Sequence, residues 1–213
     1  MADQKKYLRR MLGECRASLA PEFAQSRSVA IQRRFIDAEW YRCCRRIVLY
    51  SPIQNEVATD LIAADALKSA KEVFFPRLDR ARGMIAMARV SDPSNLVPGP
   101  FGIAQPPEGA PVAAPAELSG AVIAVPGLGF GPQGQRLGRG GGHYDRFLAA
   151  LPHEAITVGL AYSFQLLDGV PEEPRDRRLQ YIITESALLP AAGPSVRGGA
   201  ARADRGGTPG WII

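Results

Sequence analysis

Apolar residues recur at helical spacing near the start of the chain. Four of them lie three or four positions apart: Leu8, Leu12, Cys15 and Leu19. This spacing predicts an amphipathic helix over residues 3–20, with its apolar face turned to the protein interior. Pro21 suits the first turn of a second helix, which the pattern extends to about Trp40. A third helix is predicted over residues 60–71, with Thr59 in its N-cap position.

Short runs of β-branched and aromatic residues predict strands between and after these helices. Five such runs occupy residues 46–51, 72–76, 121–125, 157–162 and 180–184. A weaker hairpin signal lies at residues 85–90, and a further helix is predicted over residues 143–151. Strands that alternate with helices favour an α/β layered fold with a mainly parallel sheet.

Two segments show neither the helical spacing nor the short strand-like runs described above. Residues 91–118 are rich in Pro, Gly and Ala, and irregular segments of this length inside a compact domain tend to be functional. Residues 187–213 form a Gly-, Ala- and Pro-rich tail, which we expect to be disordered. The prediction is therefore one α/β domain over residues 1–186, followed by this tail.

Composition narrows the class of protein and of its partners. The chain has 213 residues, 46% of them hydrophobic, which suffices for one sizeable core and excludes collagen and coiled coil. The formal net charge of +5 favours anionic partners such as nucleotides or RNA. The polar start is no signal peptide, and no apolar run approaches the ~18 residues of a membrane span. Because the three cysteines also lack ligand spacing, we expect a cytoplasmic protein with reduced thiols.

The strongest chemical signal is the stretch Gly-Gln-Arg-Leu-Gly-Arg-Gly-Gly-Gly-His-Tyr-Asp-Arg at residues 134–146. Its glycines let the backbone turn N–H groups toward a ligand, and the helix behind them adds its dipole. Arg136 and Arg139 supply countercharge, and Asp145 is spaced to hold a metal that bridges phosphate oxygens. These features predict a site for a nucleoside triphosphate with Mg²⁺. The alternative is a flexible surface loop that tolerates glycine.

Two other nucleotide-binding patterns do not apply here. No Gly-Lys-Ser/Thr sequence follows the glycines, so the loop is not a Walker A motif. Residues 129–134 match the dinucleotide pattern Gly-x-Gly-x-x-Gly, but Pro132 interrupts them and no helix is predicted where that pattern requires one.

Two weaker signals involve charged residues near the ends of predicted elements. Lys5 and Arg9 share one face of the first helix and reach phosphates if that face lines the site; the alternative is a solvated cationic face. Glu56 follows the first predicted strand, where open α/β sheets bind ligands. Its alternative role is that of an acid that favours the nearby helix N-terminus.

Together these segments resemble the 5-formyltetrahydrofolate cyclo-ligase (5,10-methenyltetrahydrofolate synthetase) family. Five family motifs occur in order between Lys5 and Glu185, at residues 5–9, 56–59, 102–106, 126–130 and 136–146. They read Lys-x-x-Leu-Arg, Glu-x-x-Thr, Gly-Ile-Ala-Gln-Pro, Pro-Gly-x-x-Phe and Arg-Leu-Gly-x-Gly-x-Gly-x-Tyr-Asp-Arg. The glycine block is highly specific, and the order of the other motifs supports it.

The resemblance implies both a fold and a reaction. The fold is three-layer α/β/α with a mainly parallel sheet, resembling the NagB/RpiA/CoA-transferase-like fold. The reaction is an ATP- and Mg²⁺-dependent ring closure of 5-formyltetrahydrofolate. ATP phosphorylates the formyl oxygen, N10 attacks the activated carbon, and phosphate leaves to give 5,10-methenyltetrahydrofolate, ADP and phosphate. The protein then mainly positions ATP and neutralises charge on the transferring phosphoryl group.

The resemblance also assigns residues to ligands, by position in the motifs. ATP is held by Lys5, Arg9, Arg136, Leu137, Gly138, Arg139, Gly140, Gly141, Gly142, His143 and Tyr144. The folate is bound by Ser51, Glu56 and Tyr144, and Mg²⁺ by Asp145 and Asp176. No residue is assigned a catalytic role. We expect a monomer that takes small-molecule substrates, ATP and a reduced folate, and binds neither membranes nor nucleic acid.

Departures from the family pattern leave a second interpretation open. Gln105 stands where the family usually has Glu, and Gly120 and Gly131 stand where acidic residues are common. Arg175 replaces a His before the second aspartate, and His143 replaces an aromatic residue after the glycines. A paralogue that acts on another compound, or a homologue that binds its ligands without turnover, is the alternative function.

A third interpretation rests on three Arg-Gly-Gly triplets, which begin at Arg139, Arg197 and Arg205. Such segments bind RNA through charge and arginine stacking. RNA binding that weakens with salt and disappears when residues 190–213 are deleted favours this alternative. The first triplet, however, is already explained by the predicted phosphate loop.

Overall fold

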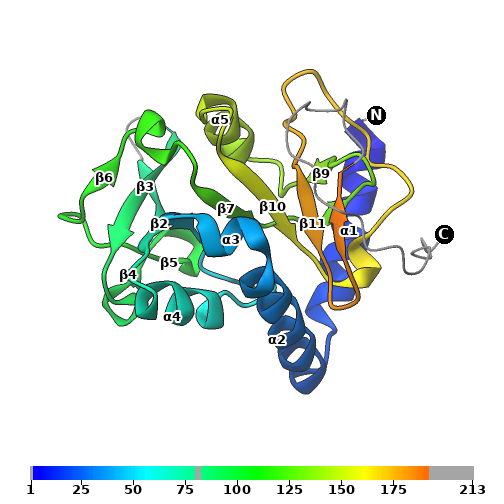
Figure 1. The fold of residues 1–213 in the computed structure, drawn as a ribbon. Coiled ribbons are helices and arrows are strands. Elements are labelled where there is room, and N and C mark those ends of the chain that lie inside the picture. The colour runs from blue at the N-terminus through cyan, green and yellow to red at the C-terminus, as the bar shows by residue number, and fades with distance from the viewer. Residues whose placement is uncertain (1, 80–82, 192–213) are drawn as a thin grey trace.

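The computed structural model describes residues 2–79 and 83–191. These residues form three layers, in which a mixed sheet lies between two layers of helices (Figure 1). The predicted α/β fold with a mainly parallel sheet is confirmed. No helix in these ranges is long and apolar enough to cross a membrane. Residues 192–213 of the predicted tail, which include Arg197 and Arg205, lie outside the described residues.

Within the described residues, the central sheet contains eight strands. From edge to edge they are β12 (Leu188–Pro190), β11 (Tyr181–Ile183), β10 (Ile156–Leu160), β7 (Val122–Val125), β1 (Arg46–Val48), β2 (Glu72–Asp79), β3 (Met84–Val90) and β6 (Val112–Ala113). The strands from β11 to β2 are parallel, and β12, β3 and β6 pair antiparallel at the two edges. Helices cover the parallel strands on both faces, which explains their nearly continuous apolar sequences.

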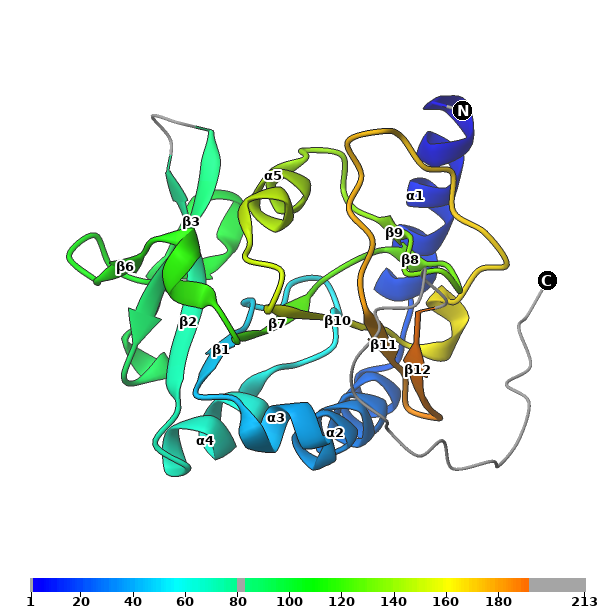
Figure 2. The ribbon, with the colours of Figure 1, turned by 45° about the horizontal axis from the view of Figure 1, so that its top comes forward.

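One face of the sheet is covered by α2 (Pro21–Asp37), α3 (Glu39–Cys43) and α4 (Asp60–Lys68), as Figure 2 shows. Ile31 and Phe35 of α2 and Ile62 of α4 are fully buried in the same cluster as Ile47 of β1. Burial of each such side chain contributes roughly 1.5–3 kcal/mol relative to leaving it exposed.

The opposite face is covered by α5 (His143–Ala150), by α1 (Ala2–Ala17) and by a small hairpin of β8 (Gly129–Phe130) and β9 (Arg136–Leu137). Phe130 of the hairpin and Phe147 of α5 pack on Val48 and Ile123 of the sheet. A separate cluster joins Leu12 of α1 to the hairpin through Leu128 and Leu137. The hairpin also explains why residues 129–134 open no helix.

Two predicted helices differ from the structure, one at its C-terminal end and one in its N-terminal cap. The predicted second helix breaks at Ala38, whose φ and ψ of −69° and 139° are extended, so α2 and α3 are separate. Thr59 is the N-cap residue of α4, as predicted, but its side chain does not cap the helix, because its hydroxyl donates to the Tyr50 carbonyl at 2.9 Å. Gln32 of α2 takes the capping role, because its side-chain oxygen accepts from the Leu61 N–H at 2.8 Å.

The predicted domain boundary at residue 186 also differs from the structure. Leu188–Pro190 forms β12, which pairs with β11 and extends the sheet by one strand. Leu188 and Leu189 pack against the cores on opposite faces of the sheet. The two leucines therefore give this part of the expected tail enough apolar contact to be ordered.

The predicted irregular segment 91–118 consists of short elements. They are η1 (Pro93–Asn95), β4 (Val97–Pro98), η2 (Pro100–Gly102), β5 (Ala104–Gln105), β6 and η3 (Pro115–Leu118); a further 3-10 turn, η4 (Ser163–Gln165), follows β10. β4 and β5 form a two-stranded ribbon, with β5 close to β2. The segment then returns the chain to the other side of β1, where it enters β7.

That return creates the topological switch point of the sheet. The chain moves from β1 outward to β2, β3 and β6, and then back to β7, so the loops after β1 and β7 diverge. In open α/β sheets, ligands bind at the carboxyl ends of the strands where the order reverses. The fold thus predicts the position of a binding site before any side chain is considered.

Candidate functional site

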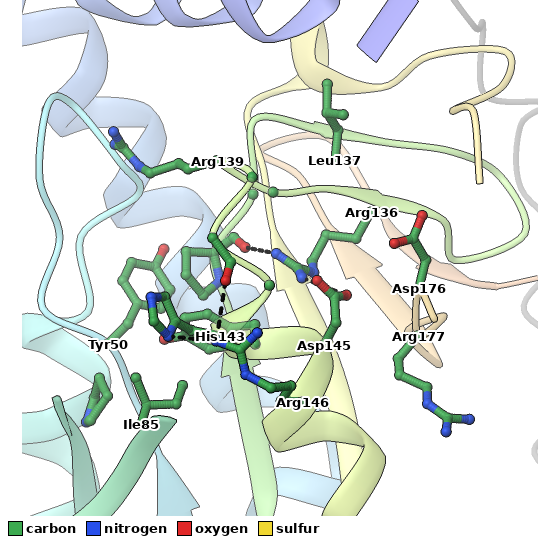
Figure 3. Close-up of a pocket in the computed structure, with 18 of the residues that line it drawn as sticks. Tyr50, Ile85, Arg136, Leu137, Arg139, His143, Asp145, Arg146, Asp176 and Arg177 are labelled. Carbon is green, nitrogen blue, oxygen red and sulfur yellow. Dashed lines mark hydrogen bonds and ion pairs between the residues drawn. The ribbon is translucent and has the colours of Figure 1, made fainter. Parts of the chain in front are cut away.

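A pocket of about 700 Å³ lies at this switch point, between the loops after β1 and β7, the β2–β3 hairpin, α1 and the start of α5 (Figure 3). It brings together every residue that the sequence assigned to a ligand. They are Lys5, Arg9, Ser51, Glu56, all ten residues from 136 to 145, and Asp176. Leu137 takes part through its backbone only, since its side chain packs with Leu12 and Leu128 and turns away from the other labelled side chains.

The glycine loop between β9 and α5 forms one wall of the pocket. Gly140 has a φ of +104°, a backbone conformation that side chains with a Cβ rarely adopt. Gly142, at φ +64°, is the N-cap residue of α5. The loop therefore needs glycine at these positions to present its backbone N–H groups at the start of α5.

Charged side chains surround this wall, with more cations than carboxylates. The cations are Lys5, Arg9, Arg136, Arg139, Arg146, Arg175 and Arg177, and the carboxylates are Glu56, Asp145, Glu173 and Asp176. Arg9 holds the loop itself, because its Nε donates to the Gly138 carbonyl at 3.0 Å. Cations outnumber carboxylates beside the N–H groups of the loop, and this arrangement favours a polyanionic ligand.

Lys5 pairs with two carboxylates of the segment that follows β10. Its Nζ lies 2.7 Å from Asp176 Oδ2 and 3.0 Å from Glu173 Oε1, and its side chain is only 6% exposed. Burial acts to lower the pKa of Lys5, but the hydrogen bonds to Asp176 and Glu173 outweigh it and raise that pKa. For Asp176 burial acts to raise the pKa, yet the hydrogen bond from Lys5 brings it below its ordinary value. Both groups are therefore charged at neutral pH.

Arg136 and Asp145 form a second cation–carboxylate pair, at 2.8 Å, and lie side by side in Figure 3. The Arg136 guanidinium also lies 5.6 Å from the centre of the Tyr144 ring. The two aspartates that were assigned to a metal are thus each paired with a cation. Within the described ranges, no three His, Cys, Asp or Glu side chains gather as a metal-binding group.

Glu56 is anchored from three sides at the opposite wall. Its Oε1 lies 3.1 Å from Arg139 Nη2 and 3.4 Å from Arg16 Nη2, and its Oε2 accepts from the Ile53 N–H at 3.2 Å. Arg16 was not among the predicted site residues. The available signal was its position on the helix face of Lys5, Arg9 and Leu12, where a cation occupies a place otherwise typical of a buried residue.

The rest of the pocket is mostly apolar, and this half was also missed. It is lined by Pro76 and Leu78 of β2, Ile85 of β3, and Pro100, Phe101 and Ile103 around η2. Phe101 is 86% exposed at the pocket mouth. Gln105 lies here too, and its side-chain oxygen accepts from the Leu78 N–H at 3.3 Å. The length and composition of segment 91–118 and the motif at residues 102–106 pointed to this region, but not to its apolar lining.

Three residues with hydroxyl groups, Tyr50, Ser51 and Tyr144, also line the pocket. Ser51 Oγ is buried and has no hydrogen-bond partner among the described residues, and such buried groups usually find one in a complete complex. Burial, and then the negative charge of Glu56, raise the pKa values of the Tyr50 and Tyr144 phenols well above the ordinary range. Both phenols therefore stay neutral at physiological pH.

Fold and pocket together define an α/β protein with a glycine loop, surrounded by cationic side chains, at the switch point of its sheet. The family model described as the 5-formyltetrahydrofolate cyclo-ligase family matches residues 1–185. The chain belongs to this family of enzymes.

Curated relatives carry the same name. The chain is 29% identical over 201 residues to a probable 5-formyltetrahydrofolate cyclo-ligase of Caenorhabditis elegans, covering 88% of this chain and 94% of the relative. It is 30% identical over 192 residues to the 5-formyltetrahydrofolate cyclo-ligase of Mus musculus, covering 86% and 94%. A relative from Arabidopsis thaliana, 28% identical with 88% and 76% covered, is named as mitochondrial.

A solved structure supports the same placement. The NMR structure of 5,10-methenyltetrahydrofolate synthetase from Aquifex aeolicus matches with a TM-score of 0.78 and 30% identity, covering 93% of this chain and 99% of that one. The predicted family membership is confirmed.

Proposed function

We propose that the protein converts 5-formyltetrahydrofolate to 5,10-methenyltetrahydrofolate in an ATP- and Mg²⁺-dependent reaction that releases ADP and phosphate. The observation that carries this proposal is that one pocket has two chemically different halves. One half combines a glycine loop with cations, and the other combines an anchored carboxylate with apolar walls. Family membership supports the choice of substrate.

The cationic half suits the triphosphate of ATP. Lys5, Arg9 and Arg136 surround the glycine loop, and Arg139 extends from the loop toward the second half. Phosphoryl transfer requires mainly alignment of the reactants and stabilisation of charge on the transferring group. Fixed guanidinium groups and loop N–H groups supply both without a covalent intermediate on the protein.

The second half suits the pterin of the reduced folate. A pterin ring offers several N–H donors, which match the carboxylate of Glu56. Ser51 offers a hydroxyl that is unpaired within the described structure, and Tyr144 lies between the two halves with a neutral phenol. The apolar walls suit the flat faces of the aromatic groups.

The proposed chemistry activates a poor leaving group. The formyl oxygen attacks the γ-phosphorus of ATP, and the bond between that phosphorus and ADP breaks. N10 then forms a bond to the formyl carbon and loses its proton, and the carbon–oxygen bond breaks with release of phosphate. The pocket holds the formyl group of one substrate and the γ-phosphate of the other close together, which lowers the entropic part of the barrier.

The carboxylates of the cationic half fit a metal that arrives with the nucleotide. Mg²⁺ is usually bound through one or two carboxylates together with substrate phosphates, and Asp145 and Asp176 are carboxylates beside the glycine loop. When bound, the metal supplies charge neutralisation at the transferring phosphoryl group. Arg136 and Lys5 pair with these aspartates in the structure. When the aspartates bind the metal instead, these two cations bind phosphate oxygens of the nucleotide.

Two further expectations belong to the same proposal. The first is a monomer as the acting unit. The second is a cytoplasmic location.

Simultaneous binding of ATP and the folate tests the proposal that each half of the pocket binds one of them. Equilibrium titration of 5-formyltetrahydrofolate is expected to give one site per chain, both alone and with the site saturated by Mg²⁺ and a non-hydrolysable ATP analogue. The affinity for the folate in the second titration is expected to be equal or higher. Competition between the two ligands would contradict the proposal, because it would mean that they share one half of the pocket.

A further inference from the structure

Arg16 is the most deeply buried cation that touches this pocket's walls. Its side chain is 2% exposed, whereas that of Arg139, the other cation on Glu56, is 43% exposed. Burial lowers the pKa of the Arg16 guanidinium, and the nearby Glu56 charge opposes this. A buried guanidinium requires several well-aligned acceptors to offset its loss of hydration.

Arg16 finds those acceptors on both loops of the switch point. Its Nε donates to the Gln54 carbonyl at 3.0 Å, and its Nη1 donates to the Gly127 carbonyl at 3.2 Å. Its Nη2 forms the ion pair with Glu56. The planar guanidinium of Arg16 therefore joins the loop after β1, which carries Glu56, to the loop after β7.

The loop that carries Glu56 needs such support. Gln54 and Asn55 have φ values of +49° and +57°, a left-handed conformation that costs free energy in residues other than glycine. Asn55 completes the attachment, because its side-chain amide donates to the Arg16 carbonyl at 3.1 Å. The backbone and side chain of Arg16 thus hold both sides of this turn.

We propose that Arg16 is a positioning residue for the folate half of the pocket, which orients the Glu56 carboxylate without touching either substrate. This inference rests on the proposed function. It also separates the two cations on Glu56. Arg139 is exposed and extends from the glycine loop, so it is free to turn to a phosphate, whereas Arg16 keeps Glu56 in place.

A double-mutant cycle tests this role, with 5-formyltetrahydrofolate binding measured in the absence of ATP. Arg16→Lys keeps the charge but loses the planar fork, so the folate affinity is expected to fall about tenfold. ATP affinity is expected to change less than about twofold, since the cations of the other half are untouched. The double variant Arg16→Lys with Glu56→Gln is expected to bind the folate as Glu56→Gln alone does, because Arg16 acts through that carboxylate.

The control and a second pair of variants guard against a general loss of structure. Arg33→Lys makes the same change at an exposed position of α2, and we expect no effect on either ligand. If Arg16→Lys does not fold, Arg16→Gln with Glu56→Gln removes both charges together and is compared with Glu56→Gln in the same way.

The outcomes distinguish this inference from the function on which it rests. Folate losses that multiply in the double variant, or an equal loss of ATP affinity, would assign Arg16 a merely structural role. A wild-type chain that binds ATP but not 5-formyltetrahydrofolate would overturn the proposed function, and this inference with it.

Discussion

Arg139→Ala is expected to weaken ATP binding by between about 10-fold and 100-fold, because hydrogen bonds between charged groups contribute about 1.5–3 kcal/mol. The side chain of Arg139 is 43% exposed and forms hydrogen bonds to Gln54 and Glu56, so the melting temperature is expected to stay close to that of the wild type. Equilibrium titration with Mg²⁺ and ATP measures the affinity.

The matched control for this variant is Arg10→Ala. Arg10 is on α1 and pairs with Glu14 on the surface, with both side chains more than 60% exposed, so the substitution removes one positive charge without entering the pocket. It is expected to leave ATP affinity unchanged within about twofold, as expected for an exposed ion pair. An unchanged ATP affinity in Arg139→Ala would refute the assignment of the glycine loop to the triphosphate.

Glu56→Gln is expected to impair folate binding far more than ATP binding. An amide keeps one acceptor oxygen but loses the charge that strengthens hydrogen bonds from the pterin, so the folate affinity is expected to fall at least about tenfold. ATP affinity is expected to change less than about twofold. Parallel titrations of the two ligands give both numbers on the same sample.

This variant also leaves Arg16 buried with one charged partner fewer. Breaking a buried ion pair costs about 3–5 kcal/mol when the remaining charge is uncompensated, so a lower melting temperature is expected. Retained ATP binding shows that the pocket is still formed despite that loss. Equal losses for both ligands would instead mean that Glu56 has only a structural part.

Features of the fold and of the site that depend on neighbouring residues in the chain could be predicted from the sequence. The glycine loop, the strand before it and the helix behind it are contiguous, and glycines at residues 140 and 142 meet conformational needs that only their own segment sets. The parallel strands are recognisable because burial on both faces demands apolar residues at nearly every position.

The parts that depend on distant contacts could not be predicted in the same way. Arg16 reaches acceptors at Gln54 and Gly127, far away in the sequence, and helical spacing alone does not distinguish such a cation from a solvated one. Thr59 has the right residue type for an N-cap, but Gln32 of another helix competes for that role. The apolar half of the pocket depends on the ribbon of β4 and β5, whose strands are too short for a periodic signal.

The most direct test of the central claim is the absorbance near the methenyl-folate band in the presence of 5-formyltetrahydrofolate, Mg²⁺ and ATP. We predict a rise that requires all three components and is strongly reduced in Arg139→Ala when the ATP concentration is close to the dissociation constant of the wild type. Absence of a rise in a wild-type chain that still binds ATP would contradict the claim. It would mean that the scaffold acts on another compound, and Gln105 and Arg175 would be the first positions to examine.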